Sequence, residues 1–281
     1  MDQKILVCLD GSKLSKAVCD YGIFISKTLD LPLVLLHVVE HSHIPSKLNL
    51  SGNLSLGIRD DLLEEFVSEE MSESKKLIQK GKAILQEFAV YAKENGVQKC
   101  EILQRHGALE DTLDALADTI KLGIIGLRGE EQNEIGSNVE ELIRNLGIPM
   151  LLVNNDFIPI KSILIAYDGS EFAIKALNAI AKNPLFPENV KRFVVNANAD
   201  AHASAKLLFE AKKLFDQKNL ELTTQVLSGD PVQSILDFSE KNNIDIIAMG
   251  AYSHNRLKTK FFGSFTTKIF LKSPKPLLLF R

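Results

Sequence analysis

The chain has 281 residues, of which 45% are hydrophobic and 25% charged, and its formal net charge at pH 7 is −3. This length suits two ordinary domains, and the apolar fraction excludes a wholly disordered chain. The three cysteines fall in no paired spacing, no apolar run reaches the roughly 18 residues of a membrane helix, and the N-terminus lacks the features of a signal peptide. We therefore expect a soluble protein of the cytoplasm, with no membrane contact.

The charge is divided unevenly along the chain. Residues 1–156 hold 16 Lys and Arg against 25 Asp and Glu, a net charge of −9, whereas residues 157–281 hold 17 against 11, a net charge of +6. Halves of opposite charge attract each other and present different surfaces to an anionic ligand. The basic residues form no dense stripe, so we expect no nucleic-acid partner.

The first half begins with a continuously apolar run from Ile5 to Leu9, which is typical of a strand buried on both faces. The tripeptide Asp10-Gly11-Ser12 then turns the chain. The patterns that follow predict a helix over 17–29, a strand over 33–39, a helix over 64–95, a strand over 100–105, a helix over 110–120, a strand over 123–127, a helix over 139–145 and a strand over 149–153.

The second half repeats this order. Its first strand, from Ile163 to Tyr167, ends in Asp168-Gly169-Ser170, 158 positions after the first such tripeptide, which indicates an internal duplication. The patterns then predict a helix over 171–181, a strand over 192–197, a helix over 203–218, a strand over 223–227, a helix over 231–241, a strand over 244–249, a helix over 266–271 and a strand over 276–280. This alternation predicts an α/β fold with a doubly wound parallel sheet in each half.

A turn-rich segment, residues 154–159, joins the halves, so we predict domains over 1–156 and 157–281. Residues 41–63 have no counterpart in the second half. Their Ser, Gly and Asn content predicts an exposed loop or lid that leads into a long helix.

Two features of each half gather at one edge of its predicted sheet. In an open parallel sheet, ligands bind at the carboxyl ends of the strands, where the strand order reverses. Both Asp-Gly-Ser turns lie at that edge, and so does a glycine-rich turn that ends in Gly136-Ser137 or Gly263-Ser264 before a helix. Such a turn offers backbone N–H groups to an anion, although a plain helix cap would explain a single one. Two of them, each paired with an Asp-Gly-Ser turn, favour a ligand site.

With these motifs the chain resembles a tandem universal stress protein, in which two UspA-like domains are fused, over nearly all of its length. The family pattern is an aspartate near the end of the first strand and a G-x2-G-x9-G-(S/T) loop after the fourth. Members with this loop bind ATP, and members without it bind no nucleotide. The resemblance implies a Rossmann-like five-stranded fold for each half, a role in the stress response, and ATP, ADP or AMP, with or without Mg²⁺, as the ligand.

Neither loop matches the pattern fully. The first has Gly126, Gly129 and Gly136, but only six residues separate the last two glycines. The second keeps nine residues before Gly263 but has Ser253 in place of the preceding glycine. Serine at that position has a cost if the backbone there needs a positive φ or a close approach to phosphate. A loop three residues shorter, in contrast, displaces the whole phosphate-binding segment. The shortened loop is therefore the larger departure.

The charges of the two loops also favour the second loop over the first as a phosphate site. The first loop carries Glu130, Glu131 and Glu134, which repel a triphosphate, and the second carries Arg256, Lys258 and Lys260. One charge pair about 4 Å apart is worth roughly 4 kcal/mol at an effective dielectric near 20, before desolvation. We therefore predict that the second domain is the main nucleotide binder. The first is either degenerate or takes a smaller or less charged ligand.

The resemblance assigns roles to the matching positions of the second half. Asp168 contacts the ribose or adenine side, and Ala197 lines the base pocket. Met249 and Gly250 lie beneath the nucleotide, and backbone groups around Ser253, Gly263, Ser264 and Phe265 hold the phosphates. The matching positions of the first half are Asp10, Val38, Ile125, Gly126, Gly129, Gly136, Ser137 and Asn138. The alternative for both aspartates is an ordinary turn residue.

The sequence contains neither a P-loop nor a nucleophile elbow, so we predict a non-catalytic or weakly hydrolytic regulatory module. The alternative is a nucleotide-free interaction scaffold that uses residues 41–63. His37, His41, His43 and His106 fall near two predicted strand ends, where zinc is conceivable. Strand and loop positions explain them better, so we predict no metal.

The fifth strand of the family commonly mediates dimer pairing. The resemblance therefore implies that residues 149–153 and 276–280 pair within one chain as an intramolecular pseudo-dimer, with a homodimer as a further arrangement. The sequence names no protein partner.

Overall fold

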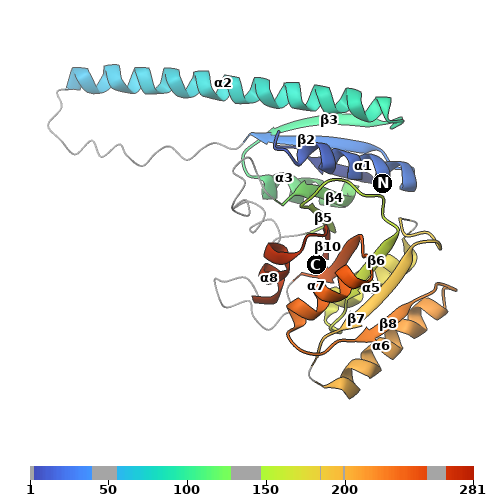
Figure 1. The fold of residues 1–281 in the computed structure, drawn as a ribbon. Coiled ribbons are helices and arrows are strands. Elements are labelled where there is room, and N and C mark those ends of the chain that lie inside the picture. The colour runs from blue at the N-terminus through green and yellow to red at the C-terminus, as the bar shows by residue number, and fades with distance from the viewer. Residues whose placement is uncertain (1–2, 40–55, 128–146, 184, 199, 252–263) are drawn as a thin grey trace.

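The computed structural model describes residues 3–39, 56–127, 147–183, 185–198, 200–251 and 264–281. In these ranges, strands and helices follow one another in the predicted order (Figure 1). The elements of the first half are β1 (Lys4–Cys8), α1 (Ser15–Leu29), β2 (Leu33–Val39), α2 (Leu56–Glu94), β3 (Cys100–His106), α3 (Leu109–Leu116), the 3-10 turn η1 (Ala117–Thr119), β4 (Ile120–Gly126) and β5 (Met150–Val153).

The second half matches the predicted bounds within two residues at nearly every element. Its elements are β6 (Ser162–Ala166), α5 (Glu171–Lys182), β7 (Lys191–Asn196), α6 (Ala201–Asp216), β8 (Thr223–Val226), α7 (Pro231–Lys241), β9 (Ile246–Gly250), α8 (Ser264–Lys272) and β10 (Leu277–Phe280). Three of its helices begin with a side-chain cap, because Ser170, Asp200 and Asp230 each accept a hydrogen bond from the first turn.

All the strands of the described residues belong to one ten-stranded sheet, in the order β3-β2-β1-β4-β5-β10-β9-β6-β7-β8. Neighbouring strands are parallel except at the centre, where β5 and β10 run antiparallel, with Leu151 opposite Leu278. The prediction that the last strands of the two halves pair within one chain is confirmed. The sheets expected for the two halves are therefore the two arms of one continuous sheet.

Each face of this sheet carries one apolar core that runs through both halves. α1, α2, α5 and α6 cover one face, and their buried residues share a cluster with alternate strand residues such as Leu151 and Leu278. α3, α7 and α8 cover the other face, where Leu152 and Leu279 lie. The strands are apolar on both sides because helices bury both of their faces.

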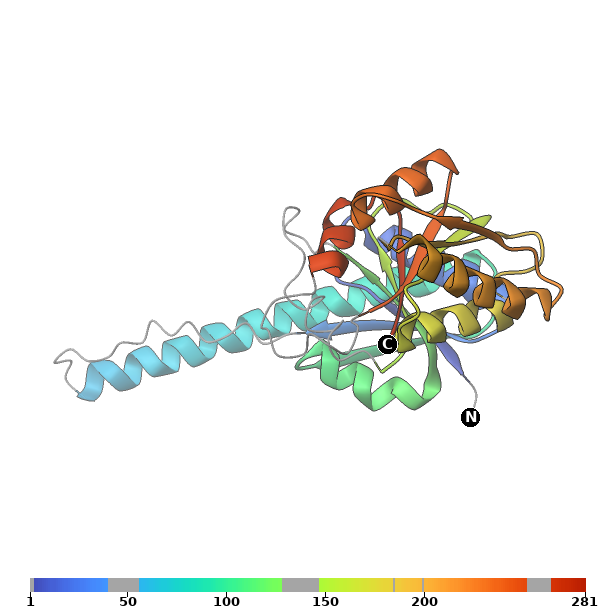
Figure 2. The ribbon, with the colours of Figure 1, turned by 90° about the horizontal axis from the view of Figure 1, so that it is seen from below.

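Two elements differ from their prediction. α2 begins at Leu56, eight residues before the predicted start, so it takes up the last part of the predicted 41–63 loop. Its 39 residues span about 58 Å at about 1.5 Å per residue, and its N-terminal part extends well beyond the sheet (Figures 1 and 2). In addition, the predicted helix over 110–120 ends early, because η1 leads straight into β4 at Ile120. The predicted helix over 139–145 lies outside the described residues.

The segment between the halves packs against α1. The ring of Phe157 meets the ring of Tyr21 edge-on at 4.8 Å between centroids, and it lies 5.8 Å from that of Phe24. Asn154 donates hydrogen bonds to the carbonyls of Ser273 and Lys275 at 2.7 and 3.0 Å, just before β10. The joint is therefore part of the shared core rather than a free tether.

Leu278 provides a test of this shared core, because it is 3% exposed and belongs to the cluster that joins the halves. Replacing it with alanine should lower the free energy of unfolding by about 2–5 kcal/mol, as measured by urea denaturation. Hydrogen exchange should show the loss of protection in strands of both halves. Leu271→Ala, at a position 59% exposed on α8, is the matched control and should change stability little. Loss of protection confined to residues 157–281 would contradict a shared core.

Candidate functional site

The strand order reverses once in each half, and an Asp-Gly-Ser turn follows the strand at that point. β1 pairs with both β2 and β4, and β6 pairs with both β7 and β9. A crevice between the carboxyl ends of two such strands is where open α/β sheets bind ligands. The structure therefore places Asp10 and Asp168 at the two positions that the fold makes available for a ligand.

Each turn is held by its own aspartate. Gly11 and Gly169 have φ values of 82° and 77°, the left-handed region that glycine adopts without strain. Asp10 Oδ1 accepts from the Ser12 amide at 2.9 Å, and Asp168 Oδ1 accepts from the Ser170 amide at 2.9 Å. Both carboxylates are exposed, and their hydrogen bonds within the described part of the chain all reach Oδ1. The second oxygen of each carboxylate has no hydrogen-bond partner among the described residues.

A second hydroxyl strengthens the turn of the first half. Ser15 Oγ donates to Asp10 Oδ1 at 3.1 Å and accepts from the Gly11 amide at 3.0 Å. Ser15 is only 3% exposed, so its hydroxyl serves the turn and is closed to a substrate.

Three residues predicted to surround the nucleotide share one face of the sheet in the second half. Met249 belongs to the core covered by α7 and α8, and Ala197 and Phe265 pack against the same core while remaining partly exposed. Met249 is only 2% exposed as a whole residue, so it lies beneath this face and offers a ligand almost no surface. This face offers an apolar surface beside Asp168, as a planar base would require.

Position 250, at the end of β9, must be glycine because the backbone of α5 approaches it closely. A Cβ at this position would lie 2.6 Å from the amide nitrogen of Ala173 and 2.8 Å from the carbonyl carbon of Phe172. The first turn of α5 therefore sits directly against the end of β9. Because α5 begins at the Asp168 turn, Gly250 also sets where that turn lies.

The first half reproduces part of this arrangement. Val38 and Ile125 pack against the core on the same face, and Gly126 ends β4 as Gly250 ends β9. The remaining predicted positions, apart from Ser264, which begins α8, lie outside the described residues: Gly129, Gly136, Ser137, Asn138, Ser253, Arg256 and Gly263. The phosphate-binding part of the site stays a prediction.

Sequence patterns did not identify a buried difference between the halves next to these turns. The strand registers pair Cys8 with Leu36 and Ala166 with Val195, so His37 and Asn196, the next residues, occupy corresponding positions. Asn196 donates to the Tyr167 carbonyl at 2.7 Å and accepts from Ser204 Oγ at 2.6 Å. This polar network ties α6 to the strand that leads into Asp168.

His37 makes no such network. Its Nδ1 is buried and has no hydrogen-bond partner among the described residues. A Cβ on Gly81 would lie 2.5 Å from His37 Nδ1 and 2.5 Å from Gln104 Nε2, so α2 approaches the sheet this closely only because residue 81 is glycine. Burial lowers the pKa of His37, Lys80 lowers it further, and Asp10 acts in the opposite direction. The structure thus holds an imidazole in its neutral form beside the Asp10 turn.

Neither a cluster of metal ligands nor a membrane-spanning helix is found in the described ranges. There, no group of three His, Cys, Asp or Glu side chains gathers closely enough to hold a metal ion, and no helix combines the length and apolarity of a membrane span. Of the four histidines that we considered for zinc, His41 and His43 fall outside these ranges.

Replacing Gly250 with alanine should destabilise the protein by about 1–3 kcal/mol, because the methyl group would overlap backbone atoms that cannot rotate away. Urea denaturation measures this effect. Gly147→Ala is the matched control, since a Cβ there meets only Ala117 Cβ at an ordinary 3.6 Å. Equal stability of the two variants would mean that α5 moves freely away from β9.

Because His37 is partly buried, the stability of the protein should depend on pH. The pKa of His37 is lowered in the folded protein, so the unfolded chain binds the proton more tightly. The free energy of unfolding should therefore fall as pH drops below about 6.5, the ordinary pKa of histidine. The His37→Asn variant carries the residue found at the corresponding position of the second half, Asn196. Its free energy of unfolding should fall less than that of the wild type between pH 7.5 and pH 5. His202→Asn, at an exposed position on α6, should leave the loss as in wild type. Equal losses in wild type and His37→Asn would contradict the assignment.

Comparison with known proteins agrees with this architecture. The profile of the Universal stress protein family matches residues 1–154 and 182–281. The universal stress protein Slr1230 of Synechocystis sp. is 30% identical over 287 residues, an alignment that covers 99% of this chain and all of that protein.

Two solved structures show the same fold over the whole chain. A universal stress protein from Archaeoglobus fulgidus superimposes with a TM-score of 0.78 at 18% identity, covering 100% of this chain and 99% of the other. A putative universal stress protein from Pseudomonas aeruginosa gives a TM-score of 0.64 at 14% identity, covering 100% and 93%. With two family matches on one duplicated sheet, the chain belongs to the universal stress protein family.

Proposed function

We propose that this protein binds ATP or a related adenine nucleotide, mainly in residues 157–281, and acts as a non-catalytic regulatory module in the stress response. One observation carries the proposal. At the point where the strand order reverses, the exposed carboxylate of Asp168 lies beside the small residue Gly250 and the apolar face that holds Ala197 and Phe265. A carboxylate oxygen for a hydroxyl beside a flat apolar surface suits a nucleoside.

The preference for the second half rests on charge. Residues 157–281 carry a net charge of +6, and their loop contains Arg256, Lys258 and Lys260, whereas the loop of the first half contains three glutamates. A triphosphate is attracted to the basic loop of the second half and repelled by the acidic loop of the first half. Mg²⁺ would accompany the triphosphate, not bind the chain by itself.

The pairing of β5 with β10 leads us to propose that the chain acts as an internal pair of domains, with boundaries at residues 1–156 and 157–281. This contact occupies the edge strands that separate domains would use to dimerise. We place the activity in the cytoplasm. Its protein partners would recognise either the nucleotide-bound or the nucleotide-free state of the chain.

The second candidate is an interaction scaffold without nucleotide. It is favoured by Ser253 in place of a glycine, and by the three residues missing from the first loop. Residues 41–63 would then be its contact surface.

Calorimetric titration of ATP, ADP and AMP with Mg²⁺ tests the proposal on the full chain, because separated halves would expose Leu151 and Leu278. We expect one strong site per chain. Asp168→Asn keeps the amide-accepting turn but removes a charged acceptor, which should weaken binding by about tenfold or more. Asp10→Asn is the matched control in the first half and should change the affinity little.

The Gly263→Val variant should abolish binding if the second loop cradles the phosphates. An effect of Asp10→Asn alone would assign the nucleotide to the first half. A folded full chain that binds none of the three nucleotides would favour the scaffold.

A further inference from the structure

A buried hydrogen-bond network supports the strand that leads into Asp168. Asn196, the last residue of β7, is 4% exposed, and its side-chain nitrogen donates to the Tyr167 carbonyl at 2.7 Å. Its Oδ1 lies 2.6 Å from the hydroxyl of Ser204, a fully buried residue of α6. The same hydroxyl lies 2.9 Å from the Asp200 carbonyl, one turn earlier. Two helix residues and two strand residues thus meet at one buried amide group.

The direction of each hydrogen bond in this network follows from its chemistry. A carbonyl oxygen can only accept, so the side-chain nitrogen of Asn196 must face Tyr167 and its oxygen must face α6. That oxygen also can only accept, so the proton of the Ser204 hydroxyl is directed to it. Ser204 therefore fixes the orientation of the Asn196 amide, and Asn196 fixes the Tyr167 carbonyl.

The two halves hold the carboxylates of their Asp-Gly-Ser turns in different ways. Asp10 Oδ1 accepts two hydrogen bonds, from the Ser12 amide at 2.9 Å and from Ser15 Oγ at 3.1 Å. The residue five positions after Asp168 is Ala173, which has no hydroxyl. Among the described residues, Asp168 Oδ1 accepts a single bond, from the amide two residues later. The carboxylate of the second half therefore keeps more of its capacity to accept hydrogen bonds.

The support that Asp168 lacks at its side chain is present at the peptide before it. The Tyr167 amide donates to the Val195 carbonyl at 2.9 Å, and the Tyr167 carbonyl accepts from Asn196. Because the Tyr167 carbonyl and the Asp168 amide belong to one planar peptide group, a fixed carbonyl also fixes the plane that leads into Asp168. At the position of Asn196 the first half has His37, whose Nδ1 makes no such bond in the described ranges.

This network acts from beneath the site and not within it. Asn196 and Ser204 are both buried, so neither offers a ligand a surface. The next residue, Ala197, is partly exposed and packs against the core on the other face of the sheet. Asn196 thus lies between the strand end that carries Asp168 and the apolar surface beside it.

We propose that Asn196, oriented by Ser204, is a positioning residue for the carboxylate of Asp168. It holds the turn from the backbone side, so the carboxylate stays in place with one internal hydrogen bond and presents its other acceptor positions to the ligand. The nature of that ligand rests on the proposed nucleotide function. The arrangement gives the second half an advantage that is independent of the charges of the two loops.

Exchange of the Ser170 amide with water tests the positioning role without a ligand, because this amide donates to Asp168 Oδ1. Ser204→Ala removes the donor to Asn196 and should speed this exchange by about two- to tenfold, the effect of losing one hydrogen bond. Asn196→Ala removes both bonds and should speed it further. Solvent-exchange NMR on the ¹⁵N-labelled full-length protein measures these rates.

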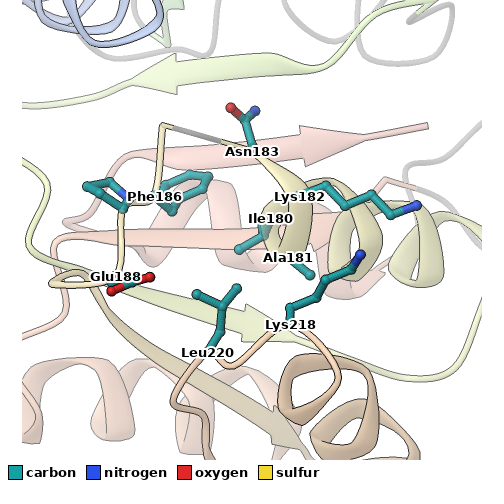
Figure 3. Close-up of a pocket in the computed structure, with 9 residues that line it drawn as sticks. Ile180, Ala181, Lys182, Asn183, Phe186, Glu188, Lys218 and Leu220 are labelled. Atoms are coloured by element: carbon teal, nitrogen blue, oxygen red, sulfur yellow. The ribbon is translucent and has the colours of Figure 1, made fainter.

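Two variants outside the network are the controls. Ser239→Ala removes a hydroxyl that is also buried, at 1% exposure, and that donates to the Leu236 carbonyl of α7 at 2.7 Å. Lys182→Gln changes an exposed residue at the far end of α5, beside the surface groove that Figure 3 shows. Both should leave the Ser170 exchange rate as in the wild type. Thermal unfolding should show similar losses for Ser204→Ala and Ser239→Ala, so a difference at Ser170 reports the turn and not global stability.

Calorimetric titration of ATP tests whether the network acts through Asp168. Ser204→Ala should weaken binding by about two- to tenfold in the wild-type chain. In the Asp168→Asn background the same substitution should weaken it no further, because the charged acceptor that the network positions is already lost. A general loss of stability would instead act equally in both backgrounds.

Equal Ser170 exchange rates in Ser204→Ala and Ser239→Ala would overturn the proposal. So would additive losses of affinity in the double variant that combines Ser204→Ala with Asp168→Asn. A folded wild-type chain that binds no nucleotide would contradict the proposed function, and the exchange rates at Ser170 would then decide the role of Asn196 by themselves.

Discussion

The antiparallel pairing of β5 with β10 is the contact on which the rest of the molecule depends. Without it, each half would end in a strand of unpaired backbone groups, and the leucines of those strands would lie at an open edge. With it, two sheets become one, and the helices on each face cover a core that passes through both halves. The pairing reverses the sheet direction, so the carboxyl ends of one half face the same side as the amino ends of the other. The two Asp-Gly-Ser turns consequently lie on opposite edges.

The duplicated fold is filled with different chemistry in its two halves. Where the second half has Asn196 in a closed polar network, the first has His37 with a buried and unpartnered nitrogen. Where the first half has Leu33, the second has Arg192, which is 3% exposed and whose guanidinium donates hydrogen bonds to four backbone carbonyls that precede β7. Both differences occur at positions that have the same strand register in the two halves. The backbone fold is therefore the same, and only the side-chain contacts near the ends of the strands differ.

Much of the fold could be predicted from the sequence, because apolar runs buried on both faces and the repeated Asp-Gly-Ser turn are local signals. α7 matches its predicted bounds, since Pro231 after the cap Asp230 defines its start. The early start of α2 was missed because residues 56–63 mix apolar and charged residues without a capping signal. The positions of Asp10 and Asp168 followed from topology. The roles of Gly250, His37 and Arg192 could not be foreseen, since each depends on contacts between elements that are distant in the sequence.

The order of the strands also determines how copies of this chain can meet. With β5 and β10 in the interior, the sheet has two edges left, β3 and β8, and they differ in length and sequence. Contact of β3 in one copy with β8 in the next would be heterologous, and it would generate an open-ended ribbon unless the rotation closed a ring. Exposed charges on β3, Glu101 and Arg105, oppose such addition. The internal duplication therefore does more than join two domains. It places β5 and β10, the edge strands through which separate domains would pair with other copies, in the interior of one sheet, where they are already paired.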